Sequence, residues 1–279
     1  MNNGLLVVNK PKGMTSRDVV NKICRKFNTK SVGHIGTLDP LAEGVLVCLI
    51  GKYTKLANIL TNHDKEYIAS FKLGILTDTL DITGKVLKEG KKEFSKDETT
   101  SALNHFKGTY NQEVPIYSAV KVNGKKLYEY ARNNIDVKLP SKIVNIYDIE
   151  LIDIKDDIIT IKCKVSKGTY IRSLIRDIGA FLDTYATMIS LVRTNLGNFN
   201  IDEAYTLEDI ESNNYKLLKL NDFLDVVTKK IDNEEDYKHI KNGNVTNIKS
   251  NNYILFTYED EDIALYEPFD SKIKPLIMF

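Results

Sequence analysis

The chain has little cysteine and little histidine, which argues against thiol and metal chemistry. Its three cysteines, Cys24, Cys48 and Cys163, are odd in number and widely spaced, so they form neither a disulfide framework nor a CxxC metal motif. The four histidines show no HExxH or comparable ligand spacing. The sequence therefore predicts no metal site.

Long hydrophobic runs are also missing. The apolar stretch between Gly44 and Gly51 is far too short to cross a bilayer, and Leu5–Val8 is too short for the core of a signal peptide. At 279 residues and 42% hydrophobic content the chain can bury a full core. We therefore expect a globular cytoplasmic protein with no membrane partner.

The net charge is only +1, so the total does not indicate a nucleic-acid partner. Positive charge is nevertheless concentrated in two segments, residues 10–30 and 121–142. Charge runs of this kind usually form solvated faces, but two such segments could also line one basic groove. Both interpretations remain open at this point. The basic residues are Lys10, Lys12, Arg17, Lys22, Arg25, Lys26 and Lys30 in the first segment, and Lys121, Lys125, Lys126, Arg132, Lys138 and Lys142 in the second.

Hydrophobic periodicity predicts an α+β fold with a mixed, mainly antiparallel sheet flanked by helices. Residues 159–165 alternate apolar and polar side chains, as a half-buried strand does, and the apolar segment 143–154 precedes them across an Asp-Asp turn. Residues 16–27 and 174–182 have helical spacing, with Ser16 as the expected cap of the first helix. Single helices among long alternating strands favour α+β over repeated βαβ units.

The pattern changes near residue 227, where a polar stretch is followed by short strand candidates. We therefore expect a large N-terminal domain over residues 1–227 and a small β-rich domain over residues 228–279.

The motif "GHIGTLDPLAEG", residues 33–44, contains the most informative carboxylate. Asp39 precedes a proline, which drives its backbone toward extended geometry, and the neighbouring glycines permit close approach of another chain. An Asp-Pro pair in a glycine-rich loop is often only a turn. A second unusual residue, Arg172, lies near the start of a predicted helix, where the positive end of the helix dipole disfavours a cation, although it could equally be a surface arginine one turn before Arg176. An ion pair between Arg172 and Asp39 would keep the carboxylate charged and aimed, as a nucleophile requires.

Asp78 and Asp81, in "TDTLDITG", form a second candidate group of carboxylates. They could serve a magnesium-dependent phosphotransferase, but a short DxxD among threonine and glycine is typical of turn chemistry. We interpret them as turn residues.

Several motifs in order along nearly the whole chain resemble the TruB-type tRNA pseudouridine synthases. They are "GLLVVNKPKGMTSRDVV", "GHIGTLDPLAEGVL", "GKYTK", "KEY", "VPIYSAVKVNGKKLYEYAR", "KGTYIRSLIRDIG" and "YKHIKNGNV". The resemblance implies a pseudouridine synthase fold with a C-terminal PUA-like domain, and isomerisation of the uridine at position 55 in the tRNA T-loop. It implies no cofactor, a T-arm partner and a monomer.

The resemblance also implies roles for particular residues. Asp39 would be the essential aspartate, Tyr67 the ring that stacks on the target uracil, and Arg172 the partner of Asp39. Five further residues would contact or surround the RNA: His34 at the displaced T-loop nucleotides, Lys10 at the cleft entrance, Tyr170 near the aspartate, Leu191 in the pocket wall and Lys125 in an inserted arm over residues 125–142.

One aspartate suits this reaction, because the uracil leaves C1' through N1 and returns through C5 with no external group entering. Asp39 could act as nucleophile on the sugar or the ring, or as a base, and the sequence does not choose among these. The alternative function is a non-catalytic tRNA-binding folding module, or RNA chaperone. A module that only binds RNA would gain nothing from a carboxylate that repels phosphate.

Overall fold

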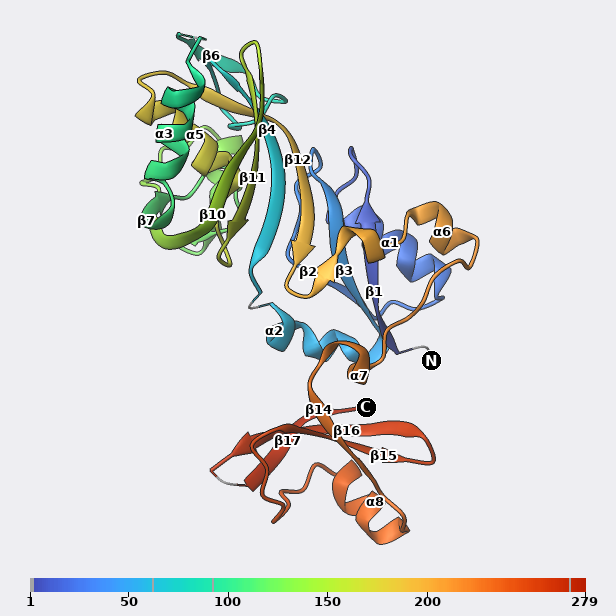
Figure 1. Cartoon of the computed structure of the whole chain (residues 1–279). Helices are drawn as coiled ribbons and strands as arrows, with labels where there is room; N and C mark the ends of the chain where they lie inside the picture. Colours follow the sequence, from blue (N-terminus) through green and yellow to red (C-terminus); the bar gives the residue numbers. More distant parts are fainter. Residues whose placement is uncertain (1–2, 62, 92, 271) are drawn as a thin grey trace.

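The computed structural model describes residues 3–61, 63–91, 93–270 and 272–279. Within them the chain forms one nine-stranded sheet, a separate four-stranded sheet and two small hairpins (Figure 1). The large sheet has the order β1-β3-β12-β4-β11-β10-β7, with β2 paired to β3 and β13 to β12. Its strands are β1 Gly4–Lys10, β2 Val32–Ile35, β3 Glu43–Ile50, β4 Lys65–Leu73, β7 Gly108–Glu113, β10 Ser141–Lys155, β11 Ile158–Val165, β12 Ala186–Leu196 and β13 Phe199–Asn200.

Every neighbouring pair in the large sheet is antiparallel except β3 and β12, which run parallel over a short register that pairs Val192 with Glu43 and Arg193 with Gly44. The predicted α+β fold with a mainly antiparallel sheet is therefore confirmed. The parallel pair joins the two halves of the sheet, and 135 residues of intervening chain separate the end of β3 from the start of β12.

Helices cover the two halves of the sheet separately. Figure 1 shows α3 (Lys96–His105) and α5 (Ile171–Phe181) together beside β10 and β11, and their apolar faces share one core with β4 and β12. The helix α1 (Ser16–Lys26) packs on β1 and β3 in a second core. The shorter helices are η1 Gly51–Leu56, α2 Ala57–Leu60, α4 Leu127–Arg132, η2 Ile201–Glu203, α6 Leu207–Glu211, α7 Leu220–Phe223 and α8 Glu234–Lys241.

The cap of α1 differs from the prediction by one residue. Thr15, not Ser16, is the cap: its hydroxyl accepts from the Asp18 N–H at 3.1 Å, and the Asp18 carboxylate accepts from the Thr15 N–H at 2.9 Å. Both residue types can cap, so the sequence alone did not separate them. Ser16 is instead buried and binds the backbone of Leu38, in the loop that carries Asp39.

Two hairpins extend from the large sheet. One consists of β5 (Ile75–Thr77) and β6 (Val86–Glu89), and the other of β8 (Lys121–Val122) and β9 (Lys125–Lys126). Strand β9 and helix α4 occupy the first part of the segment 125–142 that was expected to form an inserted arm, and β8 lies just before it.

The four-stranded sheet has the order β14-β15-β16-β17, formed by Val226–Lys230, Tyr253–Tyr258, Glu261–Phe269 and Lys272–Met278. The expected division after residue 227 falls inside β14. The small sheet packs against η1: the Tyr53 hydroxyl donates to Asp262 at 3.0 Å, and the Lys55 ammonium donates to the Met278 carbonyl at 2.8 Å. In the described ranges no helix has the length and apolarity to cross a membrane.

Candidate active site

Asp39 lies in the loop between β2 and β3, and four hydrogen bonds to the loop backbone hold that loop. The Ser16 hydroxyl accepts from the Leu38 N–H at 2.9 Å and donates to the Leu38 carbonyl at 3.1 Å. The Pro40 carbonyl accepts from the Gly13 N–H at 2.8 Å, and the Asp39 carbonyl accepts from the Ala42 N–H at 3.1 Å. The side chain of Asp39 is 41% exposed, so a fixed backbone presents a carboxylate that solvent and substrate can reach.

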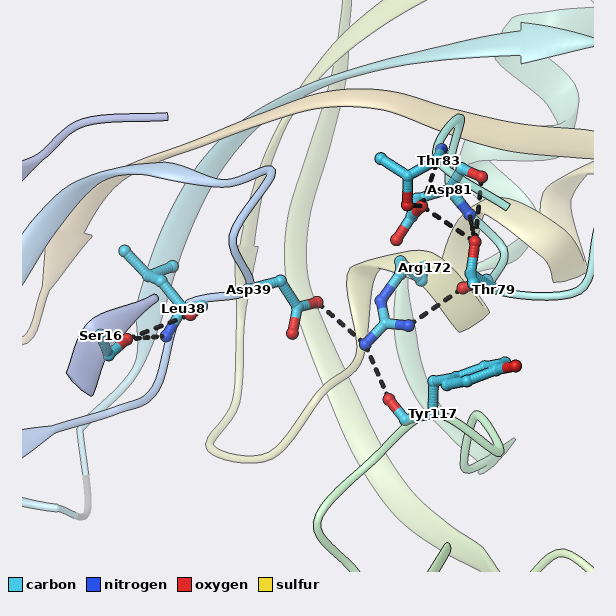
Figure 2. Close-up of polar contacts among 8 residues, drawn as sticks. All are labelled: Ser16, Leu38, Asp39, Thr79, Asp81, Thr83, Tyr117 and Arg172. Carbon is cyan, nitrogen blue, oxygen red and sulfur yellow. Dashed lines mark hydrogen bonds and ion pairs between the residues drawn. The ribbon is translucent and has the colours of Figure 1, made fainter. Parts of the chain in front are cut away.

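Arg172, in the first turn of α5, forms the predicted ion pair with Asp39. Its Nη2 lies 2.9 Å from Asp39 Oδ2, and Figure 2 shows the two side chains pointing toward each other. The guanidinium also donates to the Thr79 carbonyl from Nη1 and to the Tyr117 carbonyl from Nη2, both at 3.0 Å. The arginine side chain is only 8% exposed. These acceptors offset the unfavourable helix dipole and fix the plane of the guanidinium.

The turn before β6 supplies the Thr79 carbonyl, and Asp81 organises that turn. Asp81 Oδ1 accepts from the Thr79 hydroxyl at 2.9 Å, from the Thr83 N–H at 3.0 Å and from the Thr83 hydroxyl at 2.5 Å (Figure 2). The Asp81 carbonyl accepts from the Thr77 hydroxyl at 2.8 Å. The turn interpretation of Asp81 is therefore confirmed, and the turn itself holds one of the acceptors of Arg172.

Tyr67 and Leu191 lie on neighbouring strands, β4 and β12, in the core cluster that also contains Leu38. Tyr67 is 6% exposed and Leu191 is 8% exposed. Burial raises the pKa of Tyr67, and the positive charge of Arg193 offsets this only in part. The phenol therefore stays neutral at physiological pH.

Arg193 is a buried residue of this site that the sequence did not reveal. It is 1% exposed and pairs in register with Tyr67. Its Nε donates to the Val45 carbonyl and its Nη2 to the Gly36 carbonyl, both at 2.7 Å. These contacts clamp the loop of Asp39 to β12. In the part of the chain that the structure describes, no carboxylate lies within ion-pair distance of Arg193.

Two glycines of the Asp39 motif are explained by Arg193. A Cβ at Gly44, where φ is +97°, would lie 2.3 Å from the Arg193 carbonyl oxygen, and a Cβ at Gly36, where φ is +67°, would lie 3.1 Å from the arginine Nη1. The available signal in the sequence was a single arginine in the mainly apolar segment that forms β12, together with glycines on both sides of Asp39.

Tyr170 is the N-cap residue of α5 and precedes Arg172 by two positions; its backbone is bound by the side chain of Gln112. The Tyr170 N–H donates to Gln112 Oε1 at 2.8 Å, and the Tyr170 carbonyl accepts from Gln112 Nε2 at 3.1 Å. Burial raises the pKa of the Tyr170 phenol. Lys142, at the start of β10, places its ammonium 5.7 Å from the centre of the tyrosine ring.

The remaining predicted residues occupy three different environments. His34 lies in β2 with a buried Nδ1 that has no hydrogen-bond partner within the described residues, and burial lowers its pKa, assisted by Arg17 and Arg193. Lys125 lies on the separate β8–β9 hairpin. Lys10 was expected at the cleft entrance, but it is 0% exposed and its ammonium donates to the carbonyls of Pro11 and Met14 at 2.9 and 2.6 Å. Lys10 is therefore a buried residue whose ammonium binds the backbone of the turn that follows β1.

No group of three or more histidine, cysteine, aspartate or glutamate side chains, searched over the described ranges, is arranged to hold a metal ion. The chemistry that the site offers is that of one accessible carboxylate, an immobilised guanidinium and buried aromatic and apolar walls.

Known proteins resemble this chain in sequence and in fold. Residues 24–171 match the TruB family pseudouridylate synthase N-terminal domain, and residues 172–235 match the tRNA pseudouridylate synthase B C-terminal domain. The tRNA pseudouridine synthase B of Fusobacterium nucleatum is 45% identical over 271 residues, which cover 94% of each chain. That of Caldanaerobacter subterraneus is 39% identical over 284 residues, covering 99% of each.

Solved structures agree on the fold. The crystal structure of a Cbf5-Nop10-Gar1 complex contains a chain that superposes with a TM-score of 0.70 at 24% identity, over 99% of this chain and 84% of that one. Two domain matches and relatives of this identity over almost the full length leave one conclusion. The chain belongs to the TruB family of pseudouridylate synthases.

Proposed function

We propose that this chain is a tRNA pseudouridine synthase that converts the T-loop uridine, position 55 of tRNA, to pseudouridine. The observation that carries the proposal is the ion pair between Asp39 and Arg172, in which a buried arginine holds an accessible carboxylate on an anchored loop. Family membership and the names of the similar proteins support the same reaction on the same class of RNA.

The reaction is an isomerisation, so its atoms balance within the substrate. The C1'–N1 bond breaks, the uracil rotates, a C1'–C5 bond forms, C5 loses its proton and N1 gains one. Asp39 acts as the nucleophile that captures the sugar or the ring, or as the base that starts the elimination. Arg172 orients that carboxylate, because two backbone carbonyls fix the plane of the arginine guanidinium. No group is added or removed overall, so the reaction calls for no cofactor.

The target base must leave the T-loop to reach Asp39, as in other enzymes that act on a base. Tyr67 and Leu191 form the apolar surface that receives it, and stacking on an aromatic ring contributes about 1–3 kcal/mol per base. The segment 125–142 serves as the arm over the RNA, and the small sheet from β14 onward serves as a PUA-like domain. We expect a monomer in the cytoplasm.

The proposal is tested by tritium release from a tRNA transcript that carries 5-tritiated uridine, with EDTA present. Wild-type protein should release the tritium of one uridine per tRNA. The Asp39→Asn variant should release none above background while its RNA dissociation constant stays within about threefold of wild type, because the exchange removes only the reacting charge. A transcript with cytidine at position 55 should also release none.

Release by Asp39→Asn in a single turnover would remove Asp39 from the reaction. Release from the cytidine transcript would place the target elsewhere in the RNA. Tight binding of the tRNA without any release by wild type would favour the folding module instead.

A further inference from the structure

Gln112 is a fully buried amide on β7, the strand at one edge of the large sheet (Figure 1). Its Oε1 accepts from the Tyr170 N–H at 2.8 Å, and its Nε2 donates to the Tyr170 carbonyl at 3.1 Å. The other hydrogen of Nε2 goes to the Tyr110 hydroxyl. The amide therefore uses its acceptor and both of its donor hydrogens, and the two bonds to Tyr170 decide which end of the side chain carries the nitrogen.

The start of helix α5 is held from outside the helix. Within the described residues, the N-cap Tyr170 makes no side-chain hydrogen bond to the first turn. Strand β7 supplies the attachments instead. Besides the two bonds from Gln112 to Tyr170, the Glu113 carbonyl accepts from the Ser173 hydroxyl at 2.8 Å, and the Glu113 carboxylate accepts from Arg176 at 2.9 Å. The position of the first turn of α5 therefore follows from the position of β7.

That first turn carries Arg172, two residues after Tyr170. The arginine Nη2 lies 2.9 Å from Oδ2 of Asp39, on the loop between β2 and β3, which has attachments of its own. The distance between the two charges therefore depends on two independent sets of contacts, one for the loop and one for the helix. On the helix side, Gln112 supplies the attachment before Arg172, and Glu113 supplies those after it.

The chemistry of an amide suits this attachment. The Tyr170 N–H needs an acceptor and the Tyr170 carbonyl needs a donor, and a glutamine side chain presents both in one plane. An ionised glutamate offers an acceptor but no donor, and methionine offers neither. Because a buried backbone group without a partner is unfavourable, the backbone at Tyr170 should shift when the amide is lost, and the start of α5 should shift with it.

We propose that Gln112 is a positioning residue of the reaction: through the backbone of Tyr170 it sets where α5 begins, and so it holds the Arg172 guanidinium where it aims Asp39. The proposal rests on the proposed function, because it concerns the rate of that reaction. Gln112 acts through Arg172 and not on the substrate, since its amide is fully occupied by Tyr170 and Tyr110.

The experiment measures tritium release in a single turnover, with enzyme saturating and in large excess over the tRNA. Under these conditions a lower folded fraction leaves the rate constant unchanged, whereas a misplaced Arg172 lowers it. Gln112→Met removes both bonds to Tyr170, and Gln112→Glu removes only the donor. Asn111→Met is the matched control, because it makes the same replacement at the neighbouring, exposed amide of β7.

Gln112→Met and Gln112→Glu should each lower the rate constant by about 10- to 100-fold, as expected when catalytic groups are slightly misplaced. Their RNA dissociation constants should stay within about threefold of wild type, because the amide is buried. Asn111→Met should stay within about twofold of wild type in both measurements. Rate constants of the two Gln112 variants equal to that of the control would overturn the proposal.

A double variant shows whether Gln112 acts through Arg172. If it does, Gln112→Met should cost little once Arg172→Lys has already disturbed the aim of Asp39, because residues that act as a unit are not additive. The rate constant of the double variant should then lie within about threefold of that of the slower single variant. A double variant whose loss equals the product of the two single losses would contradict the proposal.

Melting curves separate positioning from a purely structural role. A Gln112 variant with a lower melting temperature but the rate constant of wild type would make Gln112 a structural residue and overturn the proposal. Gln112→Glu keeps the volume of the side chain and one of its bonds, so it supplies the rate constant if Gln112→Met does not fold. Failure of the proposed function is distinguishable, because wild type itself would then release no tritium.

Discussion

Arg172 satisfies its charge with one carboxylate and two carbonyls that come from three different segments of the chain. Asp39 follows β2, Thr79 lies in the turn before β6, and Tyr117 precedes the β8–β9 hairpin. A planar guanidinium can serve three acceptors at once, whereas an ammonium on a shorter, flexible stem cannot reproduce that fork. The orientation of the Asp39 carboxylate therefore depends on the shape of the arginine as well as on its charge.

Replacing Arg172 by lysine tests this dependence. Arg172→Lys should lower the single-turnover rate of tritium release by about 10- to 100-fold, since the charge remains but the orientation of Asp39 is lost. The RNA dissociation constant, measured by filter binding, should stay within about threefold of wild type because the arginine is buried. A rate equal to that of wild type would show that Arg172 has no part in aiming Asp39.

Among the residues of the site, the sequence predicted those that local structural rules mark as unusual. It missed those whose residue type is ordinary for their position. The pair of Asp39 and Arg172 was predicted because each residue conflicts with its local setting, a carboxylate before proline and a cation at a helix start. Arg193 lies in a strand, where no local rule indicates a partner for its side chain. Its hydrogen bond to the Gly36 carbonyl could therefore not be predicted. Lys10 was assigned by resemblance to an entrance, and burial of a lysine leaves no local trace in sequence.

At the scale of single elements, the turn over residues 77–85 acts on the site from outside it. Asp81 Oδ1 ties the hydroxyls of Thr79 and Thr83 together, and this fixes the carbonyl of Thr79 against Arg172. Asp78 belongs to the same turn, but its side chain accepts from the Lys85 N–H, at 2.8 Å, and not from Thr79 or Thr83 among the described contacts.

Asp81→Ala should therefore reduce the single-turnover rate by about tenfold through loss of one acceptor of Arg172, because small misplacement of catalytic groups costs this much or more. Asp78→Ala, the control from the same turn, should leave the rate within about twofold of wild type. Circular dichroism and a melting curve should show both variants folded. Equal rates for the two variants would mean that the turn does not position Arg172.

Strands and helices with several consecutive periodic residues were predicted well. The alternation over residues 159–165 and the helical spacing over residues 174–182 correspond to β11 and α5. The two-residue strands β8 and β9 were not predicted, because a pair of residues carries no period. The Thr15 cap was misplaced by one position since two capping residues adjoin.

For the whole molecule, the fold class followed from the sequence but the order of strands did not. Hydrophobic alternation shows that a strand is half buried, yet not which strand lies beside it. The insertion of β12 between β3 and β4 brings Leu191 and Arg193 to the site, although both follow Asp39 by more than a hundred residues in the sequence. Such strand pairing depends on long-range contacts that no short stretch of sequence contains.

The buried ionisable groups predict how the stability of the whole molecule changes with pH. Burial lowers the pKa of Lys10 and of Lys65 to about 8, from 10.5 in the unfolded chain. Between these values the unfolded chain holds more protons than the folded one, so stability should rise with pH. Stability begins to fall again near pH 9, because burial raises the pKa of the Cys48 and Cys163 thiols. The unfolded chain then loses these thiol protons at a lower pH than the folded chain.

The free energy of unfolding, obtained from urea titrations, should therefore increase between pH 7 and 9 by on the order of 1 kcal/mol for each lysine. Lys65→Gln isolates one of the two contributions: it should stabilise the protein most at pH 7, and its advantage over wild type should shrink toward pH 9. A stability difference between the two proteins that stays constant from pH 7 to 9 would show that Lys65 keeps its ordinary pKa and that burial does not disfavour its charged form.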